Sequence, residues 1–384
     1  MDLIYLDNNA TTKVAPEVAD AMRPFFENNY GNPSSVHRFG QQARQAVELA
    51  RAQVAKLIAA ADREIMFTGG GTESINTALR GLLAARAPRK RIVTTTVEHS
   101  ANRETCQELA KKGAELIEVG VDKEGNLDLD QWRQAITDQT AFASAMWANN
   151  ETGVIFPIAE LAKICRDKGV PFHCDAVQAA GKIPIDVRQA GVDMMSLAAH
   201  KFHGPKGVGA LFIRRGVRFA PLIVGGPQEH DRRGGTENVP AIVGLGKAAE
   251  LAQAGLPNMT THVASLRDRL ERGILETVEQ TFLNGQRTNR VPNTTNIAFS
   301  QLEAEAILLL LSERGICASA GAACSSGSLE PSHVLKAMKI PSSIAHGSLR
   351  FSLSRYTTET EIDQTLQILP AMIARLRRVL PVGA

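Results

Sequence analysis

Short apolar segments alternate with helical patterns along much of the chain, and this alternation restricts the possible folds more than any other feature. Apolar positions at Val47, Ala50, Val54 and Leu57 recur with helical spacing, which predicts an amphipathic helix over about residues 35–60. Strand-like runs are found at residues 65–68, 91–96, 141–148, 170–174, 194–198 and 208–213, with helical patterns such as 158–168 between several of them. Strands that alternate with helices predict a mainly parallel sheet covered by helices on both faces.

The chain length predicts more than one domain, because 384 residues exceed what one typical hydrophobic core holds. Residues 254–261 have the composition of a turn and are interpreted as a boundary. The patterns beyond it are a helix at about 262–281, a strand near 294–299, a helix near 303–314 and a C-terminal helix. We therefore expect a large α/β domain over residues 16–256 and a smaller α+β domain over residues 257–384. We expect residues 1–15 to pack against the small domain.

Composition and charge argue against several classes of protein. Apolar residues make up 44% and charged residues 22% of the chain, which is typical of folded globular proteins. The 43 basic and 40 acidic side chains give a net charge of +3, and there is no long run of Lys or Arg. This balance gives no reason to expect nucleic-acid binding. The densest basic cluster, residues 86–91, is interpreted as a solvated loop that leads into a strand.

The N-terminus and the cysteines indicate a cytoplasmic protein. Residues 1–7 carry acidic side chains where a signal peptide requires positive charge, and the longest aliphatic run, residues 306–311, is too short to cross a membrane. Five cysteines without CxxC spacing do not predict a disulfide framework. No metal site is expected either, although His200 and His203 are three residues apart.

Two groups of polar residues follow predicted strands, where ligands bind in open parallel sheets. Gly71 and Thr72 end a glycine-rich turn before a helix, so backbone N–H groups there could hold a phosphate. The turn is neither a P-loop nor a dinucleotide-binding GxGxxG, and a plain glycine turn with a Thr cap is the alternative. Asp175 closes another strand, with Gln178 three residues later. A buried carboxylate can keep a pyridine nitrogen protonated, although an acid at this position can also be a helix cap.

Two further segments contain a candidate amine and a candidate thiol. Lys201 follows an apolar strand and precedes a Gly- and Pro-rich turn, where a lysine of lowered pKa could bind a carbonyl cofactor covalently; Lys206 in the turn is interpreted as structural. Cys324 is surrounded by Gly, Ala and Ser over residues 318–328, which predicts a mobile loop with one nucleophile. The alternative is a flexible linker with an incidental thiol. No base is adjacent, so a Cys-His hydrolase is disfavoured, and Cys317 is expected to pack as a small hydrophobe.

Distinctive strings along nearly the whole chain resemble one family, the NifS/IscS cysteine desulfurases. The strings are YLDNNATT at 5–12, GNPSS at 31–35, VEH at 97–99, WANNETG at 147–153, AAHKFHGPKGVG at 198–209, RGGTEN at 233–238, LEPSH at 329–333 and RFSLSRYTT at 350–358. The resemblance implies the aminotransferase-like fold type I of pyridoxal-phosphate enzymes. This fold has a large domain with a mainly parallel seven-stranded sheet and a smaller α+β domain.

The same resemblance implies the role of each site residue. Lys201 would bind pyridoxal 5'-phosphate covalently, and Cys324 would accept sulfur from L-cysteine. The other implied contacts are His99 stacking on the cofactor ring, Asp175 at its nitrogen, Gln178 at its phenolic oxygen, Gly71, Thr72 and His200 at its phosphate, and Asn150 and Arg350 at the substrate. Thr236 would reach the phosphate in the partner subunit, which implies a homodimer.

Two departures from the family and several alternatives accompany this interpretation. Ala198 and Ala322 stand where many relatives have Ser, which affects one phosphate contact and the neighbourhood of the thiol. The alternatives on the same fold are an aminotransferase, which the Cys324 segment disfavours, a selenocysteine lyase and a sulfur donor for tRNA thiolation. A non-catalytic binding protein would need none of Lys201, Asp175 and Cys324. The WANNETG string and the short C-terminus favour the NifS branch, which supplies sulfur to iron–sulfur scaffold proteins and to nitrogenase.

Overall fold

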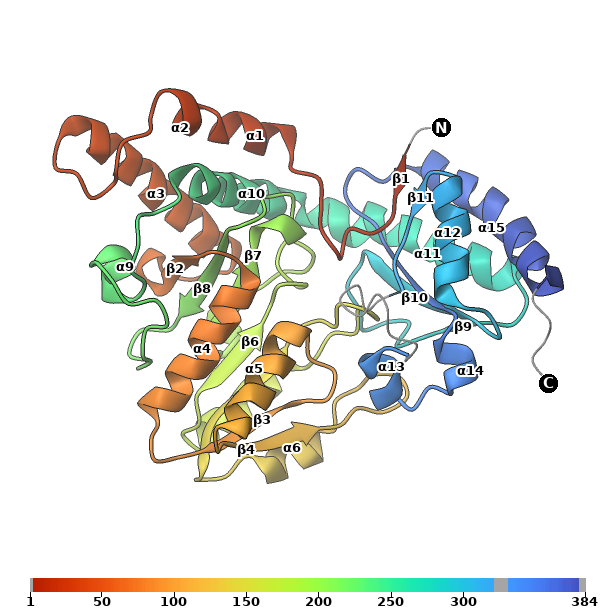
Figure 1. Cartoon of the computed structure of the whole chain (residues 1–384), viewed down its shortest axis with the longest axis horizontal. Helices are drawn as coiled ribbons and strands as arrows, with labels where there is room; N and C mark the ends of the chain where they lie inside the picture. The colour runs from red at the N-terminus through yellow and green to blue at the C-terminus, as the bar shows by residue number, and fades with distance from the viewer. Residues whose placement is uncertain (1–2, 321–330, 380–384) are drawn as a thin grey trace.

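The computed structural model of the chain describes residues 3–320 and 331–379. Its elements form two parts, each with its own hydrophobic core, and Figure 1 shows these parts side by side. The larger part contains the seven-stranded sheet and its covering helices, with a core on each face of the sheet, and the smaller part contains a three-stranded sheet. The exact domain limits given above stay a prediction.

The large sheet is mainly parallel, as the sequence predicts. Its strands, in spatial order, are β2 (Ile65–Thr68), β8 (Gly209–Ile213), β7 (Met194–Ala198), β6 (Phe172–Asp175), β5 (Thr140–Met146), β3 (Arg91–Thr95) and β4 (Glu115–Val119). Only β8 runs antiparallel to its two neighbours. The central strands are buried on both faces, which explains why they are continuous apolar runs.

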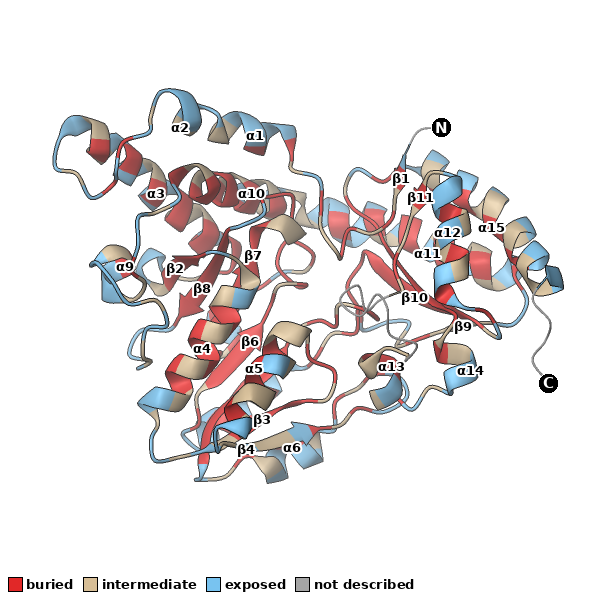
Figure 2. Cartoon of the chain, viewed as in Figure 1, coloured by how far each residue is buried: buried red, intermediate tan, exposed pale blue. Residues whose placement is uncertain are grey.

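Along β2 and β7, successive residues point into different cores. Met66 and Met194 pack under α4 (Gly71–Ala85) and α5 (Ser100–Lys111), while Phe67 and Met195 pack on the opposite face. Among the helices that contribute to the opposite core are α3 (Arg38–Leu57), α6 (Leu129–Ala135), α7 (Ile158–Asp167) and α10 (Val239–Asn258). Figure 2 shows the strands buried between helices whose outer faces are exposed. The sheet is thus the middle layer of three.

The smaller part is built on an antiparallel sheet. Its strands are β12 (Ser348–Ser352), β10 (Thr294–Phe299) and β9 (Thr281–Leu283), with β10 in the middle. The helices α11 (Ala264–Thr277), α12 (Ala304–Glu313) and α15 (Glu359–Val379) share its core. Near the N-terminus, β1 (Ile4–Tyr5) pairs with β11 (Ile316–Cys317), and both Ile4 and Leu6 are buried in this core.

A continuous helical rod connects the two cores and corrects one expectation. Residues 254–261 do not form a turn: α10 continues into a π-helical turn at Met259–Val263 and then into α11. Pro257 lies two residues before this π turn, and an extra residue in a helical turn accommodates irregular hydrogen bonding. The composition therefore marks an irregularity in a helix that spans both parts (Figure 1).

The remaining elements are short. They are α1 (Pro16–Met22), α2 (Pro24–Glu27), α8 (Val187–Ala190), α9 (Gln228–Asp231), α13 (His333–Ala337), α14 (Ser342–Ala345) and the 3₁₀ turns Asp62–Glu64 and Ala199–Lys201. Among the helices that the structure describes, none combines the length and apolarity needed to cross a membrane.

Candidate active site

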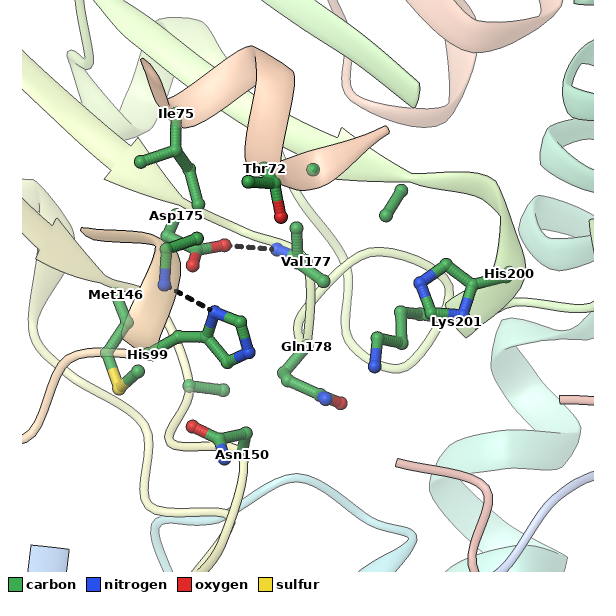
Figure 3. A pocket seen from close by; sticks show the side chains of 14 residues that line it. Thr72, Ile75, His99, Met146, Asn150, Asp175, Val177, Gln178, His200 and Lys201 are labelled. Atoms are coloured by element: carbon green, nitrogen blue, oxygen red, sulfur yellow. Dashed lines mark hydrogen bonds between the residues drawn. The ribbon is translucent and has the colours of Figure 1, made fainter. Parts of the chain in front are cut away.

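A cavity of about 190 Å³ lies at the carboxyl ends of the parallel strands, where the sequence placed most candidate residues. Eight predicted residues line it: Gly71, Thr72, His99, Asn150, Asp175, Gln178, His200 and Lys201. Figure 3 shows the labelled side chains around this space. Segments distant in sequence therefore converge on one pocket, because each follows a different strand of one sheet.

The first wall of the cavity is the N-terminus of α4. Gly70 has a positive φ of 143°, and Gly71 starts the helix. A Cβ on Gly71 would lie 3.0 Å from Val177 Cγ2, so a side chain there would crowd the pocket wall. The first N–H groups of this helix have no intrahelical acceptor and carry the positive end of the helix dipole. This wall is suited to an anion such as a phosphate.

Asp175 and His99 form the second wall. Asp175 is 5% exposed and accepts a hydrogen bond from the Val177 N–H at 3.0 Å. Burial raises the pKa of Asp175 to about 6, against the attraction of Lys201. His99 caps α5, with its Nδ1 accepting from Ala101 N–H at 3.1 Å. Burial and Lys201 lower the pKa of His99 to about 4, so its ring is neutral at pH 7 with the proton on Nε2.

Lys201 approaches the cavity from the other side, beside the N-terminal segment. Its Nζ donates to the carbonyl oxygens of Asn9 at 2.7 Å and Ala10 at 2.8 Å. Gln178 Nε2 donates to the same Asn9 oxygen at 3.0 Å. His200 Nδ1 lies 3.1 Å from Thr11 Oγ1, and burial together with Lys201 lowers the pKa of His200 to about 4. The YLDNNATT segment therefore forms part of the site.

Arg350 lies next to the cavity without lining it. It is 2% exposed on β12, and its guanidinium donates to the Asn150 carbonyl oxygen at 3.0 Å and to Asp7 Oδ1 at 2.8 Å. Asn150 itself lines the pocket. Thr236 is exposed in the loop before α10 and does not line this chain's cavity. The resemblance assigned it to the partner subunit, and that role stays a prediction.

Cys324 lies outside the described residues, but the residues on both sides of its segment are placed beside the site. On one side, Ser319 and Arg350 exchange backbone hydrogen bonds. On the other, Ser332 Oγ donates to Glu151 Oε2 at 2.5 Å, and His333 Nε2 lies 2.9 Å from the Glu98 carbonyl oxygen.

The other cysteines are poor nucleophiles. Cys106, Cys165 and Cys174 are buried, and burial raises the pKa of each thiol. Cys317 is half-buried, and burial with the nearby Asp7 raises its pKa as well. In the part of the chain that the structure describes, no His, Cys, Asp and Glu cluster is arranged to hold a metal ion.

Sequence reasoning missed three buried polar residues around the cavity. Glu98 is fully buried, and burial raises its pKa to about 8 while Thr95 and the Met146 N–H donate to it. Asn9 is the acceptor shared by Lys201 and Gln178. Lys182 lies under Gln178. Asn9 and Glu98 lie inside the strings YLDNNATT and VEH, which was the available signal for them, whereas no pattern distinguished Lys182 from a surface residue.

Comparison with known proteins gives consistent relatives. The aminotransferase class-V family matches residues 4–365. Cysteine desulfurase 2 of Trichormus variabilis is 54% identical over 99% of this chain and 96% of its own length. Cysteine desulfurase NifS of Azotobacter vinelandii is 54% identical over 98% of this chain and 94% of its own.

Solved structures agree with the sequence relatives. A NifS-like protein superposes with a TM-score of 0.92 at 38% identity, over 97% of this chain and all of that one. SspA in complex with cysteine superposes with a TM-score of 0.83 at 33% identity, over 92% of this chain and all of that one. The fold is therefore shared with these proteins.

Proposed function

The chain belongs to the aminotransferase class-V family and functions as a cysteine desulfurase, and we propose that it uses pyridoxal 5'-phosphate to move the sulfur of L-cysteine onto Cys324. The observation that carries the proposal is the convergence of Lys201, Asp175, His99 and the α4 N-terminus on one cavity. A binding protein would have no use for a lysine, a buried carboxylate and an imidazole in this arrangement.

The cavity fits pyridoxal phosphate group by group. The N–H groups at the start of α4, with Thr72 and His200, would hold the phosphate. Asp175 would keep the proton on the pyridine nitrogen, because a buried carboxylate stabilises a cation placed against it. His99 would lie against the ring, and Gln178 would donate to its phenolic oxygen. Thr236 of the partner subunit would complete the phosphate site in a homodimer.

The protein's own residues would then perform the proton transfers. When bound, pyridoxal phosphate draws electrons from Cα of an amino acid attached to it, so that the Cα proton becomes acidic. Lys201 would bind the aldehyde carbon covalently before substrate arrives, and its released amine would move the Cα proton. Arg350 would hold the substrate carboxylate through its planar fork, with Asn150 beside it.

Cys324 would take the sulfur. Its thiolate attacks Sγ of the substrate, so an S–S bond forms and the Cβ–Sγ bond breaks, leaving its electron pair on the carbon. The carbon skeleton takes up protons and leaves as L-alanine, and Cys324 retains a persulfide. An acceptor thiol or a reductant later removes the outer sulfur. We propose an iron–sulfur scaffold protein as that acceptor, consistent with the similarity to NifS of Azotobacter vinelandii.

One experiment tests this proposal. L-Alanine and sulfide release from L-cysteine would be measured with a reductant for wild type, Cys324→Ala and the control Cys317→Ala, while the visible absorbance of the cofactor is recorded. We expect Cys324→Ala to lose both products with its absorbance unchanged, and Cys317→Ala to stay active. Equal activity in wild type and Cys324→Ala would mean that sulfur leaves by direct elimination and would overturn the proposed role of Cys324.

A further inference from the structure

Lys182 is a buried lysine that faces two side-chain amides. It is 3% exposed, and its Nζ donates to Gln178 Oε1 at 2.5 Å and to Asn9 Oδ1 at 2.7 Å. It follows Gln178 by four residues in the turn after β6. Neither partner is charged, so these contacts do not form an ion pair.

The charged groups around Lys182 are unfavourable to a cation. Burial lowers the pKa of Lys182 well below its usual value, and the charges of Lys201 and Arg350 lower it further. His203 also lies within range of its charge. Within residues 3–320 and 331–379, no carboxylate forms an ion pair or hydrogen bond with Lys182. Burying a lysine without an acidic partner lowers the stability of the fold, so the presence of Lys182 here is not explained by stability.

The contact with Gln178 has a specific consequence for the orientation of the amide. In the structure the Lys182 amine donates to Gln178, so the atom of Gln178 that faces it is the acceptor Oε1. The Nε2 group is then directed to the other side, where one N–H reaches the Asn9 carbonyl oxygen at 3.0 Å. Gln178 lines the cavity, so its second N–H is available to a ligand there. Lys182 therefore fixes the Oε1 side of the amide, and the Asn9 carbonyl oxygen fixes the Nε2 side.

Asn9 extends the same network to the catalytic lysine and to the smaller core. Its carbonyl oxygen accepts from both Gln178 and Lys201, and its Oδ1 accepts from Lys182 and from Asn293 Nδ2 at 3.2 Å. Its Nδ2 donates to Thr294 Oγ1 at 2.9 Å, at the start of β10. Figure 3 shows Lys201 and Gln178 on the same side of the cavity, as their shared acceptor requires.

We propose that Lys182 is a positioning residue of the reaction. It fixes the Gln178 amide with Nε2 toward the cofactor's phenolic oxygen, and through Asn9 it fixes the position of that amide relative to Lys201. This inference rests on the proposed function, because it takes pyridoxal phosphate as the ligand of the cavity. A hydrogen bond to the phenolic oxygen stabilises its anionic form, so the position of Gln178 tunes the ionisation and the absorbance of the bound cofactor.

The test uses the full chain, stripped of cofactor and titrated with pyridoxal phosphate. For Lys182→Met we expect roughly tenfold weaker binding, the effect of one misplaced hydrogen bond to a charged group. We also expect the pH midpoint of the visible absorbance to rise. Lys182→Gln is polar and disturbs the fold less, but its side chain is one bond shorter and falls short of Gln178 Oε1. It should show the same two changes, and it carries the test if Lys182→Met does not fold.

A double-mutant cycle separates positioning from a merely structural role. If Lys182 acts through Gln178, the double variant with Gln178→Leu should bind pyridoxal phosphate no more weakly than Gln178→Leu alone. Lys168→Met is the matched control, because Lys168 also donates two hydrogen bonds, to the carbonyl oxygens of Arg133 and Ile136. It should leave both the affinity and the pH midpoint unchanged.

The outcomes distinguish this inference from the proposed function. Wild-type affinity and an unshifted midpoint in the Lys182 variants would overturn the inference, and so would additive losses in the cycle. Failure of the wild-type chain to bind pyridoxal phosphate would instead overturn the proposed function, whatever the Lys182 variants do.

Discussion

Arg350 and Ser319 exchange both of their backbone hydrogen bonds: Arg350 N–H donates to the Ser319 oxygen at 2.7 Å, and Ser319 N–H donates back at 3.2 Å. The residue proposed to hold the substrate carboxylate is thereby joined to the base of the Cys324 segment. The pair is an isolated antiparallel bridge, so these two backbone positions are held together directly.

The first prediction concerns the shape of the Arg350 side chain. Arg350→Lys keeps the charge but loses the planar fork, so we expect KM for L-cysteine to rise roughly 10- to 100-fold, from the loss of about 1.5–3 kcal/mol. Steady-state alanine formation measures this. Arg290→Lys is the control, because Arg290 is a buried arginine of the same part paired with Glu271. It should lower stability and leave KM as it is; an equal rise in KM in both variants would contradict a substrate role.

The second prediction concerns the far end of the Cys324 segment. Ser332→Ala removes the hydrogen bond to the buried Glu151, so the segment is held less firmly beside Asn150. We expect slower persulfide formation, by roughly five- to tenfold for the loss of about 1 kcal/mol of positioning, with an unchanged cofactor spectrum. Single-turnover alanine formation provides the measurement. Ser265→Ala, at an exposed position of α11, is the control, and identical rates in both variants would show that this anchor has no effect.

The third prediction follows from the buried His173, which lies 2.8 Å from both Ser144 Oγ and Ser196 Oγ. Burial lowers its pKa to about 3, whereas the unfolded chain has the usual value near 6.5. The unfolded state thus binds a proton first, and stability is lost as the pH falls from 6.5 toward 3. Between pH 7 and pH 5 this amounts to about 2 kcal/mol.

The matching experiment replaces His173 by Gln, which can bond the same hydroxyl groups without titrating. Urea unfolding of the cofactor-free protein at pH 7 and pH 5 should show a free energy of unfolding that falls by about 2 kcal/mol less in the variant. The same fall in both proteins would mean that His173 is not held neutral by the fold.

The fourth prediction concerns the loss of folding stability caused by the buried charge of Asp175. Burial raises the pKa of Asp175 in the folded state to about 6, whereas the unfolded chain has the usual value of 3.8. The folded state therefore binds the proton more tightly than the unfolded state, and the protein loses stability as the pH rises from 3.8 through 6. Asp175→Asn cannot ionise, and at pH 7 the cofactor-free variant should be more stable by up to about 3 kcal/mol. Thermal unfolding tests this.

The same Asp175→Asn variant should lose at least about 100-fold in alanine formation, because an amide cannot keep the ring nitrogen protonated. A gain in stability with a loss of activity would identify Asp175 as a residue retained for its chemistry. A variant that is less stable and fully active would contradict both expectations.

Sequence patterns predicted the parallel sheet because its strands are buried on both faces and are therefore continuous apolar runs. The same physical rule explains the strand that was missed: β4 is an edge strand whose glutamates face solvent, so it lacks the apolar signature. The helical rod at residues 254–261 was mistaken for a turn, since Gly and Pro are rare inside helices and only the packing on both cores overrides that preference.

The residues of the candidate site also fall into those that the sequence could predict and those that it could not. Residues at strand ends, such as Asp175 and Lys201, could be found because a sheet brings such positions together. Lys182 and Asn9 could not, because their role depends on which atoms face one another inside the fold. A lysine or asparagine in a loop is usually solvated, and only the contacts distinguish the exception.

The rod from α10 through the π turn to α11 has a mechanical consequence. It is embedded at one end in the larger core and at the other in the smaller, so the two parts cannot slide independently. Helical hydrogen bonding is irregular at Met259–Val263, so any bending of one part against the other would be concentrated there.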